Sequence, residues 1–220
     1  MTLAAHQPYF LPYFPYWQLI AAADTFLVSD DYAFMKGSWI PRNRILVGGM
    51  PQYFRIELDH QSCHRLISDT FLKPLAAREK LRTLEMAYHK APFFAEGYAL
   101  SARILTCPER RLSLFLAHSI REVCDYLGIT TRMLFSSSLS GAQLRKSERI
   151  FHYCRSLGAD RYINAIGGQA LYDKTRFARE GIALHFLQSE AGLSGLSVLH
   201  DIMFHSREAL HERLGQYRLL

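Results

Sequence analysis

The chain has 220 residues, of which 49% are hydrophobic and 21% charged, so it has the composition of a globular protein with a sizeable core. No apolar run approaches the roughly 20 residues that a membrane span needs. The N-terminus lacks the basic and apolar regions of a signal peptide. The sequence therefore excludes a membrane span and predicts a cytoplasmic protein.

The formal net charge of +6 favours anionic partners such as phosphates, nucleotide-linked substrates or RNA. The chain has no dense block of Lys and Arg, so the charge alone does not indicate nucleic-acid binding. Four cysteines are scattered without a CxxC pair, namely Cys63, Cys107, Cys124 and Cys154. In a cytoplasmic chain they are expected to be reduced thiols, mostly in the core.

The most unusual stretch is residues 6–17, His-Gln-Pro-Tyr-Phe-Leu-Pro-Tyr-Phe-Pro-Tyr-Trp. It holds too many prolines for a strand or a helix and is too apolar for a solvated loop. Residues 2–5 predict a short buried strand that ends at His6. We interpret the loop, with Gln7 and Tyr9, as the wall of a site. The alternative is a segment that only packs against the edge of the core.

A βαβ unit is expected to follow. Residues 16–23 predict a helix, and residues 25–29 predict a buried strand that ends at Asp30 and Asp31. His6 and these two carboxylates would then lie at the carboxyl edge of a parallel sheet, where open α/β folds bind ligands. We therefore treat His6, Asp30 and Asp31 as candidate catalytic residues. A turn or a helix N-cap is the alternative role for the acidic pair.

Basic and aromatic side chains cluster in residues 32–45. A guanidinium and an ammonium so close in sequence suit phosphate or carboxylate binding, although a basic surface turn would look the same. The candidate substrate-binding residues here are Lys36, Trp39, Arg42, Asn43 and Arg44. Residues 45–47 and 51–58 predict a β-hairpin with one wet face.

A metal site is a weak alternative at residues 59–64. His60, Cys63 and His64 are potential ligands, but no second ligand pair matches them, so a polar loop is the better interpretation and no metal site is predicted.

From residue 65 the pattern becomes helical. Helices are predicted over 74–90, 96–106 and 112–126, with Gly128 as a C-cap. They would form a helical subdomain, residues 65–128, that covers or flanks the sheet within a single α/β domain spanning residues 1–220.

The alternation of strands and helices resumes at residue 129. Strands are predicted over 131–135, 160–164 and 182–188, with helices over 144–156, 169–179 and 196–214. The last helix packs on the body or forms a homodimer contact. Ser136–Ser138 and the pair Gly167 and Gly168 each follow a strand and precede a helix, which suits anion binding by backbone N–H groups. Both could equally be tight turns. The predicted fold is an α/β, mostly parallel sheet with flanking helices and the helical insertion.

Several segments, in order along nearly the whole chain, resemble the WbqC-like protein family. They are HQPYFLP, AAADTFLVSDD, WIPRNR, YHKAPFF, the LGI that leads into a strand, and GADRYINAIGGQALYD with its trailing GI-x-L-x-F. The family usually has YLPW followed by a glycine-containing GYF. Here Tyr13-Phe14-Pro15-Tyr16-Trp17 replaces that glycine with proline, which changes the expected path of the loop. The resemblance implies a cytoplasmic bacterial protein of surface-polysaccharide or small-molecule biosynthesis, with a transferase as the usual assignment.

A weaker similarity concerns the nucleotidylyltransferases with an HxGH motif, which share the order strand, His-containing loop, helix, strand. Only His6 is present here, and Gln-Pro-Tyr follows it. This similarity is one of fold and carries little functional weight.

Three functions compete at this stage. The first is a group-transfer enzyme that moves an acyl, aminoacyl or glycosyl group to an amine or hydroxyl, with His6 as general base. Asp30 would orient His6 or an incoming amine and Asp31 would assist. Lys36, Arg42 and Arg44 would hold an anionic group of the donor, while Tyr9 and Trp39 would exclude water.

The second is a nucleotide-dependent activating enzyme that uses Gly167, Gly168 and the serine run to hold phosphates, with Mg²⁺ on the acidic pair. The third is a protein that binds RNA, such as a charged tRNA, or a carrier. The sequence does not decide whether a cofactor is used, and nucleotide and Mg²⁺ stay open.

Overall fold

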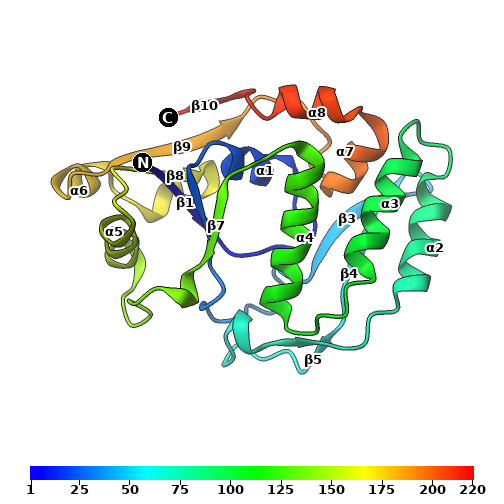
Figure 1. Cartoon of the computed structure of the whole chain (residues 1–220), viewed down its shortest axis with the longest axis horizontal. Coiled ribbons are helices and arrows are strands. Elements are labelled where there is room, and N and C mark those ends of the chain that lie inside the picture. Colours follow the sequence, from blue (N-terminus) through cyan, green and yellow to red (C-terminus); the bar gives the residue numbers. More distant parts are fainter.

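The computed structural model describes residues 1–220 and is built around one six-stranded sheet (Figure 1). The strand order is β10-β9-β8-β1-β2-β7, and every neighbouring pair is parallel except β10 with β9. The strands are β1 (Thr2–His6), β2 (Thr25–Val28), β7 (Arg132–Phe135), β8 (Arg161–Ala165), β9 (Ala183–Ser189) and β10 (Tyr217–Leu219). The prediction of an α/β, mostly parallel fold is confirmed.

Helices cover both faces of this sheet, and each face has its own buried core. The larger core contains residues of α1 (Phe14–Ala21), α2 (Ala77–Tyr88), α3 (Phe94–Leu105), α4 (Leu112–Leu127), α7 (Val198–Phe204) and α8 (Arg207–Arg213). The smaller core contains residues of α5 (Lys146–Leu157) and α6 (Lys174–Arg179). The cores form because the buried strands are apolar on both faces, as parallel strands between two helical layers must be.

The remaining four strands form two small antiparallel pairs outside the main sheet. One is formed by β3 (Arg42–Val47) and β4 (Met50–Arg55), the other by β5 (Leu58–Asp59) and β6 (Phe71–Leu72). Three short 3₁₀ helices are η1 (Ile67–Asp69), η2 (Ser136–Ser138) and η3 (Ile166–Leu171). The first hairpin begins at Arg42 rather than at residue 45, so Arg42, Asn43 and Arg44 lie in a strand and not in the loop before it.

The order of the strands creates a switch point between β1 and β8. After β1, the chain adds β2 and β7 on one side and then crosses to add β8 and β9 on the other. The connections that leave β1 and β8 therefore diverge to opposite faces and open a crevice at the carboxyl ends of these two strands. His6 ends β1 and Ala165 ends β8, so both lie beside this crevice.

Two predicted helices are wrong in extent. The helix predicted over residues 169–179 is η3 followed by α6, because the Asp173 side chain accepts a hydrogen bond from the Thr175 N–H at 2.9 Å and starts a new helix there. The C-terminal helix predicted over 196–214 is likewise divided. Ser206 caps α8 by accepting from the Ala209 N–H at 3.2 Å, and the chain then ends in β10, which was not predicted.

The helical pattern also begins later than expected. Residues 65–72 form η1 and β6, and α2 begins at Ala77. The predicted cap at Gly128 is present, with φ of +73° and its N–H bonded to the Asp125 carbonyl oxygen at 3.3 Å. None of the helices is long and apolar enough to cross a membrane.

A pair of substitutions in α2 tests whether the helical insertion belongs to the same cooperative unit as the sheet. Leu84 is fully buried in the larger core, whereas Met86 on the same helix is 70% exposed. We expect Leu84→Ala to lower the free energy of unfolding by about 2–5 kcal/mol and Met86→Ala to leave it nearly unchanged. Urea unfolding followed by circular dichroism measures both. Two separate transitions in the Leu84→Ala variant would contradict a single domain.

Candidate functional site

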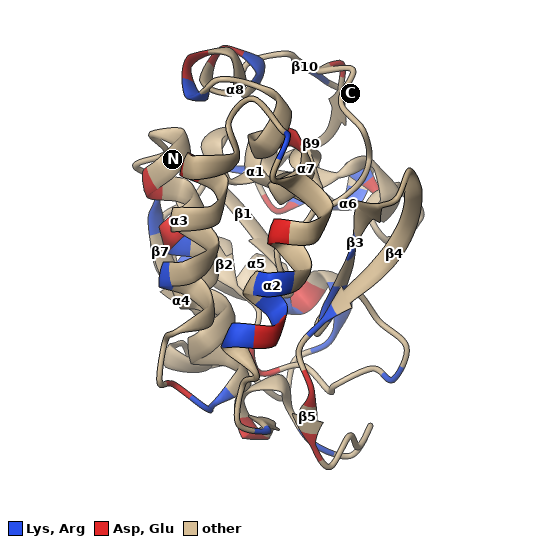
Figure 2. Ribbon diagram, turned by 90° about the vertical axis from the view of Figure 1, so that its right-hand side faces the viewer, with Lys and Arg blue, Asp and Glu red and all other residues tan.

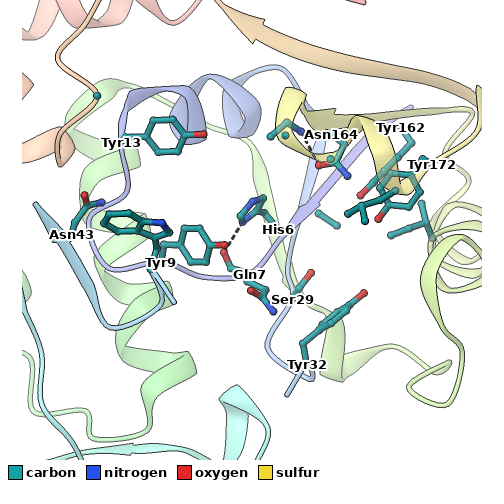
Figure 3. Close-up of a pocket in the computed structure, with 18 of the residues that line it drawn as sticks. His6, Gln7, Tyr9, Tyr13, Ser29, Tyr32, Asn43, Tyr162, Asn164 and Tyr172 are labelled. Carbon is teal, nitrogen blue, oxygen red and sulfur yellow. Dashed lines mark hydrogen bonds between the residues drawn. The ribbon is translucent and has the colours of Figure 1, made fainter. Parts of the chain in front are cut away.

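A cavity of about 580 Å³ lies at the switch point between β1 and β8 (Figure 3). Its walls come from the N-terminal aromatic-proline loop, from β3 and from the segment that follows β8. A volume of this size is typical of sites for small ligands. Arg44 is the one charged side chain in the lining, and no Asp or Glu lines it.

Eight of the candidate residues lie together in this lining. They are His6, Gln7, Tyr9, Trp39, Asn43, Arg44, Gly167 and Gly168. The other four candidates, Asp30, Asp31, Lys36 and Arg42, are not in the lining. Residues that the sequence reasoning missed include Tyr13, Ser29, Tyr32, Tyr162, Asn164 and Tyr172. Ser29 follows β2 and Asn164 is the last residue but one of β8, a position close to the signal that selects Asp30.

His6 lies between the two ends of the cavity in Figure 3, with Tyr9 and Tyr13 on one side and Asn164 on the other. Its Nδ1 is 3.0 Å from the Gln7 carbonyl oxygen. A carbonyl oxygen can only accept, so Nδ1 carries the proton and Nε2 keeps its lone pair. Burial lowers the pKa of the imidazole below its usual 6.5, against the raising effect of the Gln7 hydrogen bond. At neutral pH His6 is therefore a neutral base with a fixed tautomer.

Aromatic rings hold this imidazole in place. The rings of Tyr9 and Tyr16 meet it edge to face, at centroid distances of 4.9 and 5.1 Å. The Tyr16 hydroxyl also donates to the Gln7 carbonyl oxygen at 3.0 Å, the same oxygen that fixes the His6 tautomer. The orientation of His6 is thus determined by packing and by hydrogen bonds together.

The cavity carries several phenols that stay protonated. Burial raises the pKa of the Tyr9, Tyr13, Tyr32, Tyr162 and Tyr172 hydroxyls above their usual 10. At neutral pH they can therefore donate as well as accept hydrogen bonds. They bring apolar ring surface and neutral polar tips into one space.

Three polar side chains of the lining have capacity for a ligand. The Gln7 amide and the Ser29 hydroxyl make no side-chain hydrogen bond within the protein. Asn164 uses Oδ1 to accept from the Ala165 N–H at 2.7 Å, which leaves its Nδ2 free. A Cβ at Gly168 would lie 3.0 Å from that Nδ2, so glycine leaves room for the amide.

Asn43 has a structural task instead. Its Nδ2 donates to the Leu11 carbonyl oxygen at 2.8 Å, and its Oδ1 accepts from the Arg44 N–H. Leu11 has a φ of +48°, which is strained for a residue with a side chain. Ser197 donates to the same carbonyl oxygen at 2.9 Å, so two hydrogen bonds hold the strained residue. Asn43 fixes the loop that carries His6.

Asp30 is buried and bound to the turn after β7. Its Oδ1 accepts from the Ser137 N–H at 3.0 Å and its Oδ2 accepts from the Ser137 hydroxyl at 2.8 Å. The Ser136 hydroxyl lies 3.3 Å from Oδ1 and also donates to Asp31. The serine run therefore turns two hydroxyls toward the aspartates.

Asp31 forms a buried ion pair with Arg149 of α5, and the two side chains are 6% and 2% exposed. The Arg149 guanidinium also donates from Nε to the Tyr153 hydroxyl at 2.7 Å and lies 4.3 Å from the centre of the Tyr32 ring. Tyr32 lines the cavity, so the ion pair supports one of its walls.

Neither a cluster of potential metal ligands nor a thiol lies at the cavity. No group of three or more His, Cys, Asp or Glu side chains is close enough to hold a metal ion, including His60, Cys63 and His64. No cysteine lines the cavity. Burial raises the pKa of the Cys124 and Cys154 thiols to about 12, which keeps them protonated at neutral pH.

The fold and the geometry define an α/β protein with a cavity at the topological switch point and a half-buried, neutral histidine in its lining. The model of the WbqC-like protein family matches residues 7–211, and the chain belongs to this family. It is 30% identical over 178 residues to the uncharacterized protein Rv1507c of Mycobacterium tuberculosis. These aligned residues cover 80% of this chain and 77% of that protein. No solved structure matches the chain.

The lowered pKa of His6 predicts how the free energy of unfolding changes with pH. Above pH 6.5 the imidazole is neutral in both the folded and the unfolded chain. As the pH falls below 6.5 the unfolded chain takes up a proton that folded His6 resists, so the free energy of unfolding falls. We expect His6→Gln to lose this part of the pH dependence, measured by urea unfolding between pH 5 and pH 8. Identical pH profiles for the two proteins would contradict the assigned burial effect.

A second stability prediction concerns the ion pair between Asp31 and Arg149, which lies against Tyr32. Asp31→Asn leaves a buried guanidinium without its counter-charge and should lower the free energy of unfolding by about 3–5 kcal/mol. Glu148→Gln is the matched control, because it removes the partner of Arg176 in a pair whose side chains are about half exposed. That change should cost about 1 kcal/mol or less. Equal losses for the two variants would mean that Asp31 does not balance Arg149.

Proposed function

We propose that the protein is a group-transfer enzyme that moves an acyl, aminoacyl or glycosyl group from an activated donor to an amine or hydroxyl of a small acceptor. The observation that carries this is His6 itself, which lines a cavity of about 580 Å³ and whose Nε2 keeps its lone pair because the Gln7 carbonyl oxygen fixes the tautomer. A neutral imidazole with a fixed tautomer is suited to general-base catalysis near neutral pH.

In this reaction the acceptor nitrogen or oxygen gives its proton to His6 Nε2 as it attacks the electrophilic carbon of the donor. The bond from that carbon to the leaving group breaks, and the leaving group departs with the electron pair. His6 then returns the proton to the leaving group, so the imidazole ends neutral. Phenols of the lining such as Tyr9 and Tyr162 exclude water and donate hydrogen bonds to the sugar or carbonyl oxygens.

The acidic pair acts through other residues in this proposal. Asp30 holds the turn after β7, and Asp31 holds Arg149 and, through it, Tyr32. Both are positioning residues rather than acids or bases that touch the substrate, because neither lines the cavity. Ser136 and Ser137 are engaged by these carboxylates, so a phosphate cradle built on the serine run is less favoured. The family resemblance suggests a place in bacterial surface-polysaccharide or small-molecule biosynthesis, in the cytoplasm.

Turnover tests the role of His6. Purified protein is incubated with pools of nucleotide-linked sugars or acyl thioesters and of amine or hydroxyl acceptors, and mass spectrometry detects the transferred group. We expect His6→Ala to reduce kcat by about 10²–10⁴-fold, the usual contribution of a general base. KM should change little. Tyr13→Phe keeps the ring and loses one hydroxyl of the lining, and should retain most of the activity.

A His6→Ala variant with wild-type kcat would place the chemistry elsewhere. Rescue of that variant by added imidazole would support the assignment, because a purely structural role for His6 does not respond to a free base.

A further inference from the structure

The β3–β4 hairpin and the loop before it carry cations and no carboxylate of their own. Residues 32–56 contain Lys36, Arg42, Arg44 and Arg55 and no Asp or Glu. Figure 2 shows the basic positions on β3 and the acidic ones beyond it, near β5. Neither Arg42 nor Arg44 forms an ion pair with a carboxylate of the chain. Two neighbouring guanidiniums repel each other, so the hairpin has unused affinity for an anion.

Aromatic rings hold both guanidiniums in position. The Arg42 guanidinium lies 4.5 Å from the centre of the Tyr53 ring, and the Arg44 guanidinium lies 5.6 Å from the centre of the Trp39 ring. Arg42 is also anchored by a hydrogen bond to the Gly37 carbonyl oxygen. Arg44 and Tyr53 are directly paired across the hairpin, so their side chains share one face. The cations are therefore ordered before any ligand arrives.

The two rings themselves are open to a ligand. Trp39 and Tyr53 are 39% and 51% exposed, with ring centres 6.2 Å apart. Partly exposed aromatic rings beside paired guanidiniums provide a stacking surface and an anion site in one place.

This surface continues into the cavity, because Trp39 and Arg44 also line it. Figure 3 places Asn43, Tyr9 and Tyr13 on one side of His6, and Asn164, Tyr162 and Tyr172 on the other. The cavity thus has a cationic, aromatic end at β3 and an uncharged end of phenols and amides at β8. A ligand that spans it needs an anionic end and a neutral, hydrogen-bonding end.

We propose that the β3 end binds the nucleoside diphosphate moiety of the donor, with the base stacked on Trp39 and Tyr53 and the phosphates on Arg42 and Arg44. This rests on the proposed group transfer. The same moiety occurs in nucleotide-linked sugars and in coenzyme A thioesters. The transferred group then reaches inward to His6, and the acceptor occupies the end formed by Tyr162 and Asn164.

Tryptophan fluorescence gives a direct test, because the chain has two tryptophans and Trp17 is fully buried. We expect ADP, UDP or coenzyme A to quench the fluorescence of the wild-type protein, and Trp39→Phe to abolish the quenching. In calorimetry, Arg44→Ala should weaken Kd about tenfold or more, the effect of losing one charged hydrogen bond. Arg179→Ala removes the same charge from an exposed position on α6 and should change Kd by less than about twofold.

The individual ligands separate the sources. Tighter binding of coenzyme A than of UDP would support the proposal with an acyl donor, and the reverse would support it with a sugar donor. Pyrophosphate that binds as tightly as the nucleotides would overturn it, since the base would then contribute nothing. Equal losses of nucleotide affinity in the Arg44 and Arg179 variants would also overturn it. The same holds if tRNA binds to the protein while no mononucleotide binds at millimolar concentration.

The His6→Ala variant distinguishes this failure from a failure of the proposed function. It should bind the nucleotide as the wild-type protein does, because His6 lies away from the hairpin end. Normal nucleotide binding without any turnover in wild-type protein would leave the donor site standing and remove the group-transfer proposal. Turnover that depends on His6 without nucleotide binding would support the group-transfer proposal and remove the nucleotide site.

Discussion

The structure depends on how the backbone carbonyls of the N-terminal aromatic-proline loop find partners. Three prolines leave this buried loop short of backbone N–H donors, so its carbonyl oxygens are bound by its own side chains and by groups of neighbouring elements. The Gln7 oxygen is bound by His6 and Tyr16, and the Leu11 oxygen by Asn43 and Ser197. The Pro12 oxygen accepts from the Trp17 indole and from the Val198 N–H. Strand β3 and helices α1 and α7 are therefore joined at this loop.

The same hydrogen bonds prepare the site. The oxygen that anchors the loop at Gln7 also selects the tautomer of His6, so architecture and candidate chemistry share one atom. The cavity around His6 has phenols and amides rather than carboxylates, and Arg44 is the one residue of its lining that carries a full charge. An environment of this kind keeps the imidazole neutral, because burial disfavours its charged form. Acidic groups lie outside the cavity, where Asp31 pairs with Arg149 and so supports the Tyr32 ring of the cavity wall.

Local patterns predicted much of the fold correctly. Buried strands, glycine C-caps and apolar helix faces depend on neighbours in sequence, which is why β1, β2, α4 and the cap at Gly128 follow the predictions closely. The errors occur where a side chain starts a new element, as Asp173 and Ser206 do, because the helical pattern continues across these caps. The edge strand β10 was missed since its pairing with β9 is a long-range contact. Within the candidate site, the sequence indicates the N-terminal loop, the basic and aromatic cluster of residues 32–45, and the Gly167–Gly168 turn, with a cleft between the loop and that turn.

By itself, the sequence determined the family, the parallel α/β fold and the segments that carry candidate site residues, since these follow from periodicity and from motifs along the chain. Only the tertiary structure decided which of those segments meet. It brought Tyr162, Asn164 and Tyr172 to the cavity, because β8 crosses to the far side of β1. It also turned Asp30 and Asp31 toward Ser137 and Arg149, because a buried carboxylate requires partners and those partners come from η2 and α5, more than one hundred residues away.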